Sequence, residues 1–231
     1  MTPGLIAACT GATLGKAEDY ADALSFAMNA YGIDTPIRQA MFLPNVGAET
    51  GGLQSTVENL NYRADALLAS FGRHRISEVD ARRYGRIPGQ QEADQPAIAN
   101  CLYGGPWGAK NLGNARAGDG WLYRGRGLFQ TTGRANYQQL RDRLRKRMPS
   151  LAVPDFEQVP DKLAEPLWSS LSAADYWDMR DLGARADAGN FDHVCDLLNM
   201  GRTTERYGDA HGFAQRLALH RVARAALGLK G

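Results

Sequence analysis

The chain has 231 residues, of which 44% are hydrophobic and 23% are charged, and its formal net charge is +2. This is the composition of an ordinary globular protein and excludes a disordered or low-complexity chain. No apolar run approaches the roughly 18–20 residues that span a bilayer, so we expect no transmembrane segment and a single domain, residues 1–231, with monomer as the default state.

The N-terminal segment 1–20, MTPGLIAACTGATLGKAEDY, has some apolar character but no basic region before it, and it soon turns acidic. A secretory leader needs a basic start, an apolar stretch and a cleavage site. The segment therefore predicts mature protein and not a signal peptide.

The first predicted helix spans 16–31, where apolar residues recur at three- and four-residue steps before Gly32. Thr35 and Pro36 then have the pattern of an N-cap followed by proline at the first helical position. The helix that begins there carries apolar residues toward Glu49. Pro44 lies in its interior, where the missing N–H predicts a bend.

Helical patterns also occur in most of the rest of the chain. Between residues 104 and 132 the pattern changes to glycine-rich, aromatic sequence, which predicts a long functional loop with at most a small β-hairpin. Strand patterns elsewhere are poor, so the sequence predicts a mainly α protein. The further predicted helices are 63–71, 77–83, 96–103, 133–147, 165–179, 190–199 and 209–227.

The cysteines and histidines have no ligand spacing. The three cysteines form no short pairing pattern, so we expect no disulfide framework, and the apolar helical contexts of Cys101 and Cys195 favour buried core thiols. Each histidine is interpreted as solvated or packed, and we expect no metal and no cofactor. The residues concerned are Cys9, Cys101, Cys195, His74, His193, His211 and His220.

A basic run, RANYQQLRDRLRKR, covers the predicted helix from Arg134 to Arg147, with Asp142 as its single acid. One interpretation is a solvated helix face. The other is a patch attracted to a polyanionic surface such as a cell wall, an anionic lipid layer or nucleic acid.

Two glutamates, Glu49 and Glu58, lie nine positions apart in VGAETGGLQSTVENLNY. Hydrolysis of a glycosidic bond needs one carboxyl group as acid and a second as base or nucleophile, in different environments. Glu49, on an apolar helix against glycines, suits the acid. Glu58, beside Asn59, Asn61 and Tyr62, suits the base. The alternative is one glutamate at a helix end and another at the surface.

The segment 123–137, YRGRGLFQTTGRANY, holds hydroxyl and amide side chains that suit a water or sugar hydroxyls. It lacks a preceding strand and a GK[ST] sequence, which excludes a P-loop or dinucleotide fingerprint. Trp107, Trp121 and Tyr123 offer flat faces to sugar rings, with core packing as the alternative. For Arg124 and Arg126, structural ion pairing is preferred over substrate contact.

Four segments in this order, AETGG, ENLNY, IANCLYGG and GDGWLYRGRGLFQTTGRANY, resemble glycoside hydrolase family 19, most closely its compact phage and prophage endolysins. The resemblance runs from about Tyr20 to the C-terminus. It implies a lysozyme-like α+β, largely helical bilobal fold with a substrate cleft. It also implies inverting hydrolysis of β-1,4 links between N-acetylated amino sugars.

The resemblance also implies roles for individual residues. Glu49 takes the place of the general acid and Glu58 that of the general base, and Thr132 matches a hydroxyl residue that helps hold the attacking water. Arg216 resembles an arginine that steadies the carboxylates. Together with Arg216, the predicted substrate-binding set is Gln130, Asn136, Asn199, Tyr62 and Tyr123.

Three departures from the family pattern concern this site. Ala48 stands where histidine commonly precedes the acid, and Pro44 replaces a good helix former. Gln215 stands where aspartate is common, in a segment between Asn199 and Arg216 that is longer than usual.

The function expected from the resemblance is an endolysin that degrades peptidoglycan glycan strands. It would be made in a host bacterial cytoplasm and act on the wall, in the periplasm, after another protein permeabilises the membrane. The basic helix 134–147 would then face the anionic envelope. The alternatives are a chitinase and a non-catalytic wall-binding relative; a nucleic-acid binder lacks a matching motif, so we expect no nucleic-acid partner.

Overall fold

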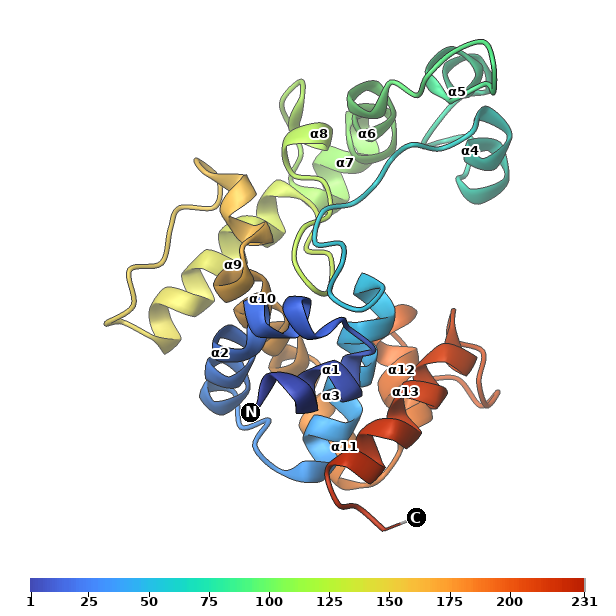
Figure 1. Cartoon of the computed structure of the whole chain (residues 1–231). Coiled ribbons are helices and arrows are strands. Elements are labelled where there is room, and N and C mark those ends of the chain that lie inside the picture. The colour runs from blue at the N-terminus through green and yellow to red at the C-terminus, as the bar shows by residue number, and fades with distance from the viewer. Residues whose placement is uncertain (231) are drawn as a thin grey trace. The chain divides into compact units, whose positions relative to one another are not determined.

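The computed structural model describes residues 1–230, and the regular elements in this range are helices, joined by turns and loops (Figure 1). The mainly α class predicted from the sequence is confirmed. The helices are α1 (Pro3–Thr10), α2 (Leu14–Ala30), α3 (Pro36–Thr50), α4 (Ala64–Ser70), α5 (Glu78–Tyr84), α6 (Gln95–Tyr103), α7 (Gly105–Leu112), α8 (Asp119–Leu122), α9 (Arg134–Arg147), the 3₁₀ helix η1 (Pro160–Ala164), α10 (Pro166–Met179), α11 (Leu182–Asp187), α12 (Phe191–Asn199) and α13 (Phe213–Ala226).

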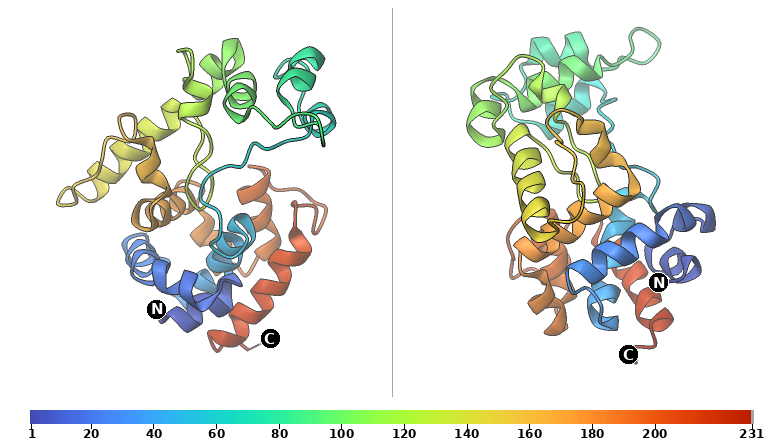
Figure 2. Two further views of the ribbon diagram at one scale, coloured as in Figure 1. Left: turned by 45° about the horizontal axis from the view of Figure 1, so that its top comes forward. Right: turned by 90° about the vertical axis from the view of Figure 1, so that its left-hand side faces the viewer.

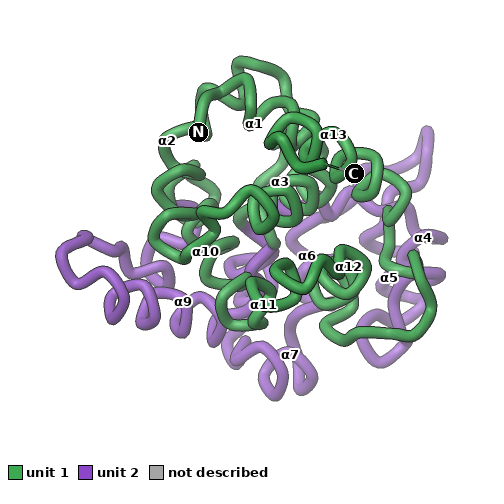
Figure 3. Tube along the Cα trace, turned by 90° about the horizontal axis from the view of Figure 1, so that it is seen from below, with its two compact units in different colours: residues 1–56, 127–129, 163–231 green, residues 57–126, 130–162 purple. Residues whose placement is uncertain are grey.

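The helices form two compact units, coloured separately in Figure 3. Unit 1 comprises residues 1–56, 127–129 and 163–231, and unit 2 comprises residues 57–126 and 130–162. Glu49 therefore belongs to unit 1, and Glu58 belongs to unit 2.

Unit 1 is built around α3. The helices α1, α11, α12 and α13 all pack on it, and α13 (red) runs beside α3 (light blue) in Figure 2. Phe42 of α3 is fully buried and makes edge-on contacts with Phe129 and Trp177. Where α1 meets α3, a Cβ on Gly47 would lie 2.1 Å from the Thr10 carbonyl oxygen. Only glycine allows this crossing.

The start of α3 has the structure predicted for it. The Thr35 side chain accepts a hydrogen bond from Arg38 N, and Pro36 is the first helical residue. Pro44 lies inside the helix without ending it. Because Pro44 has no N–H, it cannot bond the Ala40 carbonyl four residues earlier. That oxygen is instead 2.7 Å from Nδ1 of His220 on α13.

Unit 2 has its own hydrophobic core, formed by α4, α5, α6 and the segments around them. Here α6 packs against α5, α7 and α8, and α7 contacts α9. The core members are Leu60, Leu67, Ile76, Ala81, Ile98, Ala99 and Leu102, all fully or almost fully buried.

The long irregular loop predicted for residues 104–132 is wrong in part, because this segment contains α7 and α8. In place of a β-hairpin the segment has isolated bridges, one between Val57 and Arg126 and one within the segment, between Arg126 and Thr131. The helices α1 and α11 were also not predicted, and the last helix begins at Phe213 rather than 209. None of the helices in residues 1–230 combines the length and the apolar character needed to cross a bilayer.

The basic helix α9 uses its arginines partly for internal ion pairs. Arg134 contacts Asp119 at 2.6 Å and Glu157 at 3.2 Å. Arg141 contacts Asp155 at 2.8 Å and Glu157 at 3.1 Å. Both arginine side chains are only 15% exposed. These two arginines therefore hold the segment after α9, and neither contributes to a free cationic surface.

Candidate active site

Glu49 lies in the last turn of α3 and is fixed by an arginine from α13. Arg216 Nη2 donates to Glu49 Oε1 at 2.5 Å, and its Nη1 donates to Asn45 Oδ1 at 2.8 Å. The third nitrogen, Nε, donates to the His211 carbonyl at 3.1 Å. The Arg216 side chain is 4% exposed and that of Glu49 is 25% exposed. The carboxylate is thus held at one oxygen and open to solvent.

Asn45 lies one helical turn before Glu49 and orients the arginine. Its Nδ2 donates to the Met41 carbonyl at 2.8 Å, so the amide oxygen is the atom that faces Arg216. Sequence reasoning did not single out Asn45. The available signal was a polar residue in the buried face of an apolar helix, since such a residue requires a hydrogen-bond partner.

Asn199 is the last residue of α12, and its exposed side chain accepts a hydrogen bond from His211 N at 2.8 Å. His211 also provides the carbonyl that binds Arg216 Nε. The backbone of His211 therefore connects Asn199 to the arginine that contacts Glu49, within unit 1.

Glu58 is held at both carboxylate oxygens. The Tyr103 hydroxyl donates to Oε1 at 2.5 Å, and the Gly125 N–H donates to Oε2 at 3.1 Å. The Glu58 N–H in turn donates to the Gly125 carbonyl at 2.9 Å. Tyr103 is a site residue that sequence reasoning missed, although it lies in the segment IANCLYGG.

The absence of a side chain at Gly125 lets the side chains of Gln130 and Glu58 lie close to its backbone in unit 2. A Cβ there would lie 2.5 Å from Gln130 Oε1 and 3.3 Å from Glu58 Oε2. Gln130 itself has φ +47°, a left-handed conformation that is strained for a residue with a side chain. Such strain is retained where the neighbouring structure requires it. The structure thus brings Gln130 against the backbone that holds Glu58.

Thr132 and Asn136 follow directly on this loop. The Thr132 hydroxyl donates to the Gln130 carbonyl at 3.1 Å, which leaves its oxygen able to accept a hydrogen bond from water. Asn136 is exposed, and its Nδ2 donates to the Thr132 carbonyl at 2.6 Å. Tyr62 is half-buried, with its ring edge-on to Phe71 at 5.5 Å.

No family model matches the chain. A comparison with curated proteins finds a glycosyl hydrolase family 19 domain-containing protein of Haemophilus influenzae, 32% identical over 187 residues, which are 79% of this chain and 88% of the relative. The chain belongs to glycosyl hydrolase family 19. It is therefore a glycoside hydrolase.

A solved structure shares the fold of this family 19 chain. Chitinase C from Streptomyces griseus HUT6037 matches with a TM-score of 0.54 over 98% of this chain and 76% of the chitinase chain, at 15% identity. The likeness agrees with the lysozyme-like helical fold that the sequence motifs imply.

Not every aromatic residue that could offer a face to a sugar ring is exposed in this family 19 chain. Tyr123 is 1% exposed, its ring is edge-on to Tyr137, and its hydroxyl donates to the Glu157 carbonyl. The Tyr123 ring is therefore part of the core of unit 2, which is the core-packing alternative that the sequence left open. Trp107 and Trp121 each have an arginine guanidinium over one ring face, Arg75 at 3.4 Å and Arg124 at 3.7 Å.

Arg126 has the structural role preferred for it. It is 1% exposed and contacts Asp161 at 2.6 Å and the Tyr137 hydroxyl at 3.0 Å. Arg124 donates to the Trp121 carbonyl at 2.9 Å, and burial lowers the pKa of its guanidinium. Similarly, Arg216 is too buried for a primary role in substrate contact.

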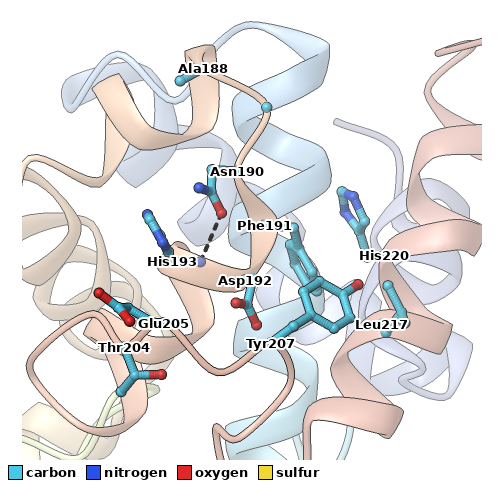
Figure 4. Close-up of a pocket in the computed structure, with 11 residues that line it drawn as sticks. Ala188, Asn190, Phe191, Asp192, His193, Thr204, Glu205, Tyr207, Leu217 and His220 are labelled. Carbon is cyan, nitrogen blue, oxygen red and sulfur yellow. Dashed lines mark hydrogen bonds between the residues drawn. The ribbon is translucent and has the colours of Figure 1, made fainter.

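Unit 1 also contains a cavity of about 570 Å³ beside α12 and α13 (Figure 4). Phe191 stacks on His220 in its wall, at 3.9 Å between ring centroids, and Asn190 caps α12 by accepting from His193 N. No predicted site residue lines this cavity. Among residues 1–230, no group of three or more His, Cys, Asp or Glu side chains is arranged to hold a metal ion.

Proposed function

We propose that this family 19 hydrolase is an endolysin that cleaves β-1,4 glycosidic bonds of bacterial peptidoglycan with inversion. The observation that carries the proposal is that a chain of this family has two carboxylates, Glu49 and Glu58, each fixed by its own hydrogen bonds. A wall-binding relative without activity would have no need for either carboxylate.

Glu49 is the general acid in this proposal. Arg216 occupies Oε1, so Oε2 is the oxygen that can carry a proton to the glycosidic oxygen as the bond breaks. The 25% exposure of the Glu49 side chain gives a substrate access to it. Ala48, where family members commonly have histidine, contributes no hydrogen bond from its side chain, whereas Arg216, itself bonded to Asn45, is a polar partner of Glu49 within unit 1.

Glu58 is the general base. Tyr103 and Gly125 each occupy one position on its two oxygens, and a carboxylate has about four acceptor positions. A remaining position takes a proton from the attacking water, which the Thr132 hydroxyl helps to hold. An inverting mechanism requires the two carboxyl groups to be roughly 6.5–9.5 Å apart, with the water between them and the sugar.

Peptidoglycan is preferred to chitin as the substrate because bacterial envelopes are polyanionic and chitin is uncharged. The C-terminal turn of α9 contributes Arg145, Lys146 and Arg147, which are exposed. Anionic polymers would be attracted to these cations, more weakly than to the full basic run because Arg134 and Arg141 are paired internally. Chitin cleavage is the second candidate, favoured by the fold shared with a chitinase.

The experiment is digestion of purified peptidoglycan and of chitin oligomers by wild type and by Glu49→Gln, with product masses and new reducing ends identified. Release of disaccharide-peptides by the wild type alone supports the proposal, and the new reducing sugar names the bond. Cleavage of chitin oligomers only would make the protein a chitinase. Cleavage of neither polymer by folded protein would refute both functions.

The same proposal includes a route to the wall. We propose that the enzyme is made in a bacterial cytoplasm and meets the wall once the membrane has been permeabilised by another protein. Cells whose membranes are permeabilised with chloroform should lyse when they contain wild-type enzyme and persist when they contain Glu49→Gln. Lysis by intracellular enzyme without permeabilisation would contradict this route.

A further inference from the structure

Glu58 accepts a hydrogen bond from a tyrosine that is itself held by contacts to its backbone and its ring. Tyr103 is the last residue of α6, and its hydroxyl donates to Glu58 Oε1 at 2.5 Å. Hydrogen bonds to an ionised carboxylate are shorter and stronger than neutral ones. Burial raises the pKa of the Tyr103 phenol far above its usual range, and the negative charge of Glu58 raises it further. The hydroxyl therefore keeps its proton and remains a donor.

The backbone of Tyr103 is fixed by close contacts in unit 2. Asn114 Nδ2 donates to the Tyr103 carbonyl at 2.8 Å, while Asn114 Oδ1 accepts from Arg134 N at the start of α9. A Cβ on Gly108 would lie 2.0 Å from the same carbonyl oxygen, so α7 packs directly against it. Three helices thus meet at this residue.

The ring of Tyr103 is fixed on its other side by Arg75. The Arg75 guanidinium lies 5.6 Å from the Tyr103 ring centroid and 3.4 Å from that of Trp107, and its Nε donates to the Leu102 carbonyl. Burial lowers the pKa of Arg75. Such contacts leave the ring little freedom to turn its hydroxyl away from Glu58.

We propose that Tyr103 is a positioning residue for the reaction, which holds the Glu58 carboxylate oriented so that its free acceptor position faces the attacking water. This inference rests on the proposed function of Glu58 as the base. Gly125 N–H fixes the second oxygen, so the carboxylate plane is defined by two donors on different segments. With one donor removed, the carboxylate can rotate and binds a proton more readily.

The test is Tyr103→Phe, which removes the hydroxyl and keeps the ring. The matched control is Tyr84→Phe, because Tyr84 packs on the same hydrophobic cluster of unit 2 but is not in the predicted site. We expect Tyr103→Phe to lower kcat about 10- to 100-fold, with KM changed less than about threefold. The acidic limb of the pH profile of kcat should move to higher pH. The control should leave kcat, KM and the pH profile unchanged.

A second measurement separates this inference from the proposed function. In protein labelled with carbon-13 at the glutamate carboxyl carbons, the Glu58 signal is identified by its loss in Glu58→Gln. Its titration midpoint should be higher in Tyr103→Phe than in wild type and unchanged in Tyr84→Phe. This result needs no substrate, so it decides the role of Tyr103 on Glu58 even if neither polymer is cleaved.

Several outcomes would overturn the proposal. An unchanged kcat and pH profile in Tyr103→Phe would show that the hydroxyl does not act on the base. A loss of kcat with an unchanged titration midpoint would indicate a structural role, as would an equal loss in Tyr84→Phe. If Tyr103→Phe fails to fold, Asn114→Ala provides the second variant: it releases the Tyr103 carbonyl, and its Glu58 midpoint should shift in the same direction by a smaller amount.

Discussion

Arg216 Nη2 donates to Glu49 Oε1 at 2.5 Å, although 167 positions separate the two residues in the chain. The contact connects the last helix of unit 1 to the end of its central helix. Removing one member of a buried ion pair costs about 3–5 kcal/mol. Because the Glu49 side chain is 25% exposed, we expect Arg216→Ala to lower the free energy of unfolding by roughly 2–3 kcal/mol.

Urea denaturation measures this loss, and Arg221→Ala is the control because Arg221 is an exposed residue of the same helix. The control should change stability by less than about 0.5 kcal/mol. Arg216→Lys should recover part of the stability, since it keeps the charge but cannot contact Glu49, Asn45 and His211 together. Equal losses in Arg216→Ala and Arg221→Ala would contradict the structural role of the pair.

Glu49→Gln and Glu58→Gln should each lower glycan hydrolysis at least about 100-fold, the usual size of a general acid or base effect. In Glu49→Gln the new amide oxygen can still accept from Arg216, so this substitution should cost about 1 kcal/mol of stability. Release of reducing sugar and thermal unfolding measure the two effects. Glu18→Gln, at an exposed position of α2, is the control and should change neither.

Gly125→Ala should reduce activity more than stability. Its new methyl group would lie 2.5 Å from Gln130 Oε1 and 3.3 Å from Glu58 Oε2, so those side chains must move. We expect at least a tenfold loss of kcat, on the order of the 1.4 kcal/mol that one displaced hydrogen bond represents. Gly15→Ala is the control, since it lies in the exposed part of α2 with nothing within 4 Å and should stabilise by up to about 1 kcal/mol.

His220 should make stability depend on pH. Burial lowers the pKa of His220 from its ordinary value of 6.5, and the charge of Arg224 lowers it further. The unfolded chain therefore binds a proton more readily than the folded one, so stability is fully present above about pH 6.5 and is lost as pH falls below it. An asparagine side chain in place of His220 can still donate to the Ala40 carbonyl but does not titrate.

The difference in melting temperature between wild type and His220→Asn should therefore change between pH 7.5 and pH 5, with wild type losing more. Asp196 has the opposite effect, because burial raises the pKa of its carboxyl. Both proteins contain Asp196, so it cancels in the comparison. If the melting temperatures of the two proteins change with pH in parallel, His220 binds a proton as readily in the folded chain as in the unfolded chain, and the prediction fails.

The basic helix should divide into structural and surface cations. Arg141→Gln breaks the contacts with Asp155 and Glu157 and should lower stability by about 1 kcal/mol. Lys146→Glu should leave stability unchanged and weaken binding to insoluble peptidoglycan roughly 2- to 5-fold at low salt. The binding difference should disappear near 0.5 M salt; a difference that persists there would not be electrostatic in origin.

The sequence predicted α3 and its start well because local chemistry determines them. Thr35 and Pro36 satisfy and pre-organise the first turn without help from the rest of the chain. The segment 104–132 was harder to predict because Gly105 and Gly108 disfavour a helix locally. A packing contact overrides that preference, since Gly108 lies against the Tyr103 carbonyl, and Gly113 then ends α7 with φ +69°, the usual role of glycine after a helix.

The two candidate glutamates stand out in the sequence, but most groups that hold them do not. Tyr103 and Asn45 act through contacts with residues that their own local patterns do not identify, 45 positions away for Tyr103 and 171 for Asn45. Tyr123 shows the reverse case, a residue that stands out in the sequence but is buried in the structure. An aromatic residue in a glycine-rich segment suits a sugar platform, yet its ring faces Tyr137 and the core. The direction in which a side chain faces depends on the fold of the whole unit.

Pro44 and His220 have a consequence for how the sequence can change. Because proline gives up the bond to the Ala40 carbonyl, a donor from α13 is needed to satisfy it. Replacing His220 first with a residue that cannot donate strands that buried oxygen, whereas replacing Pro44 first with alanine supplies an N–H and makes His220 dispensable for this hydrogen bond. The two positions are therefore epistatic, and a path in which Pro44 changes before His220 keeps the Ala40 carbonyl hydrogen-bonded throughout.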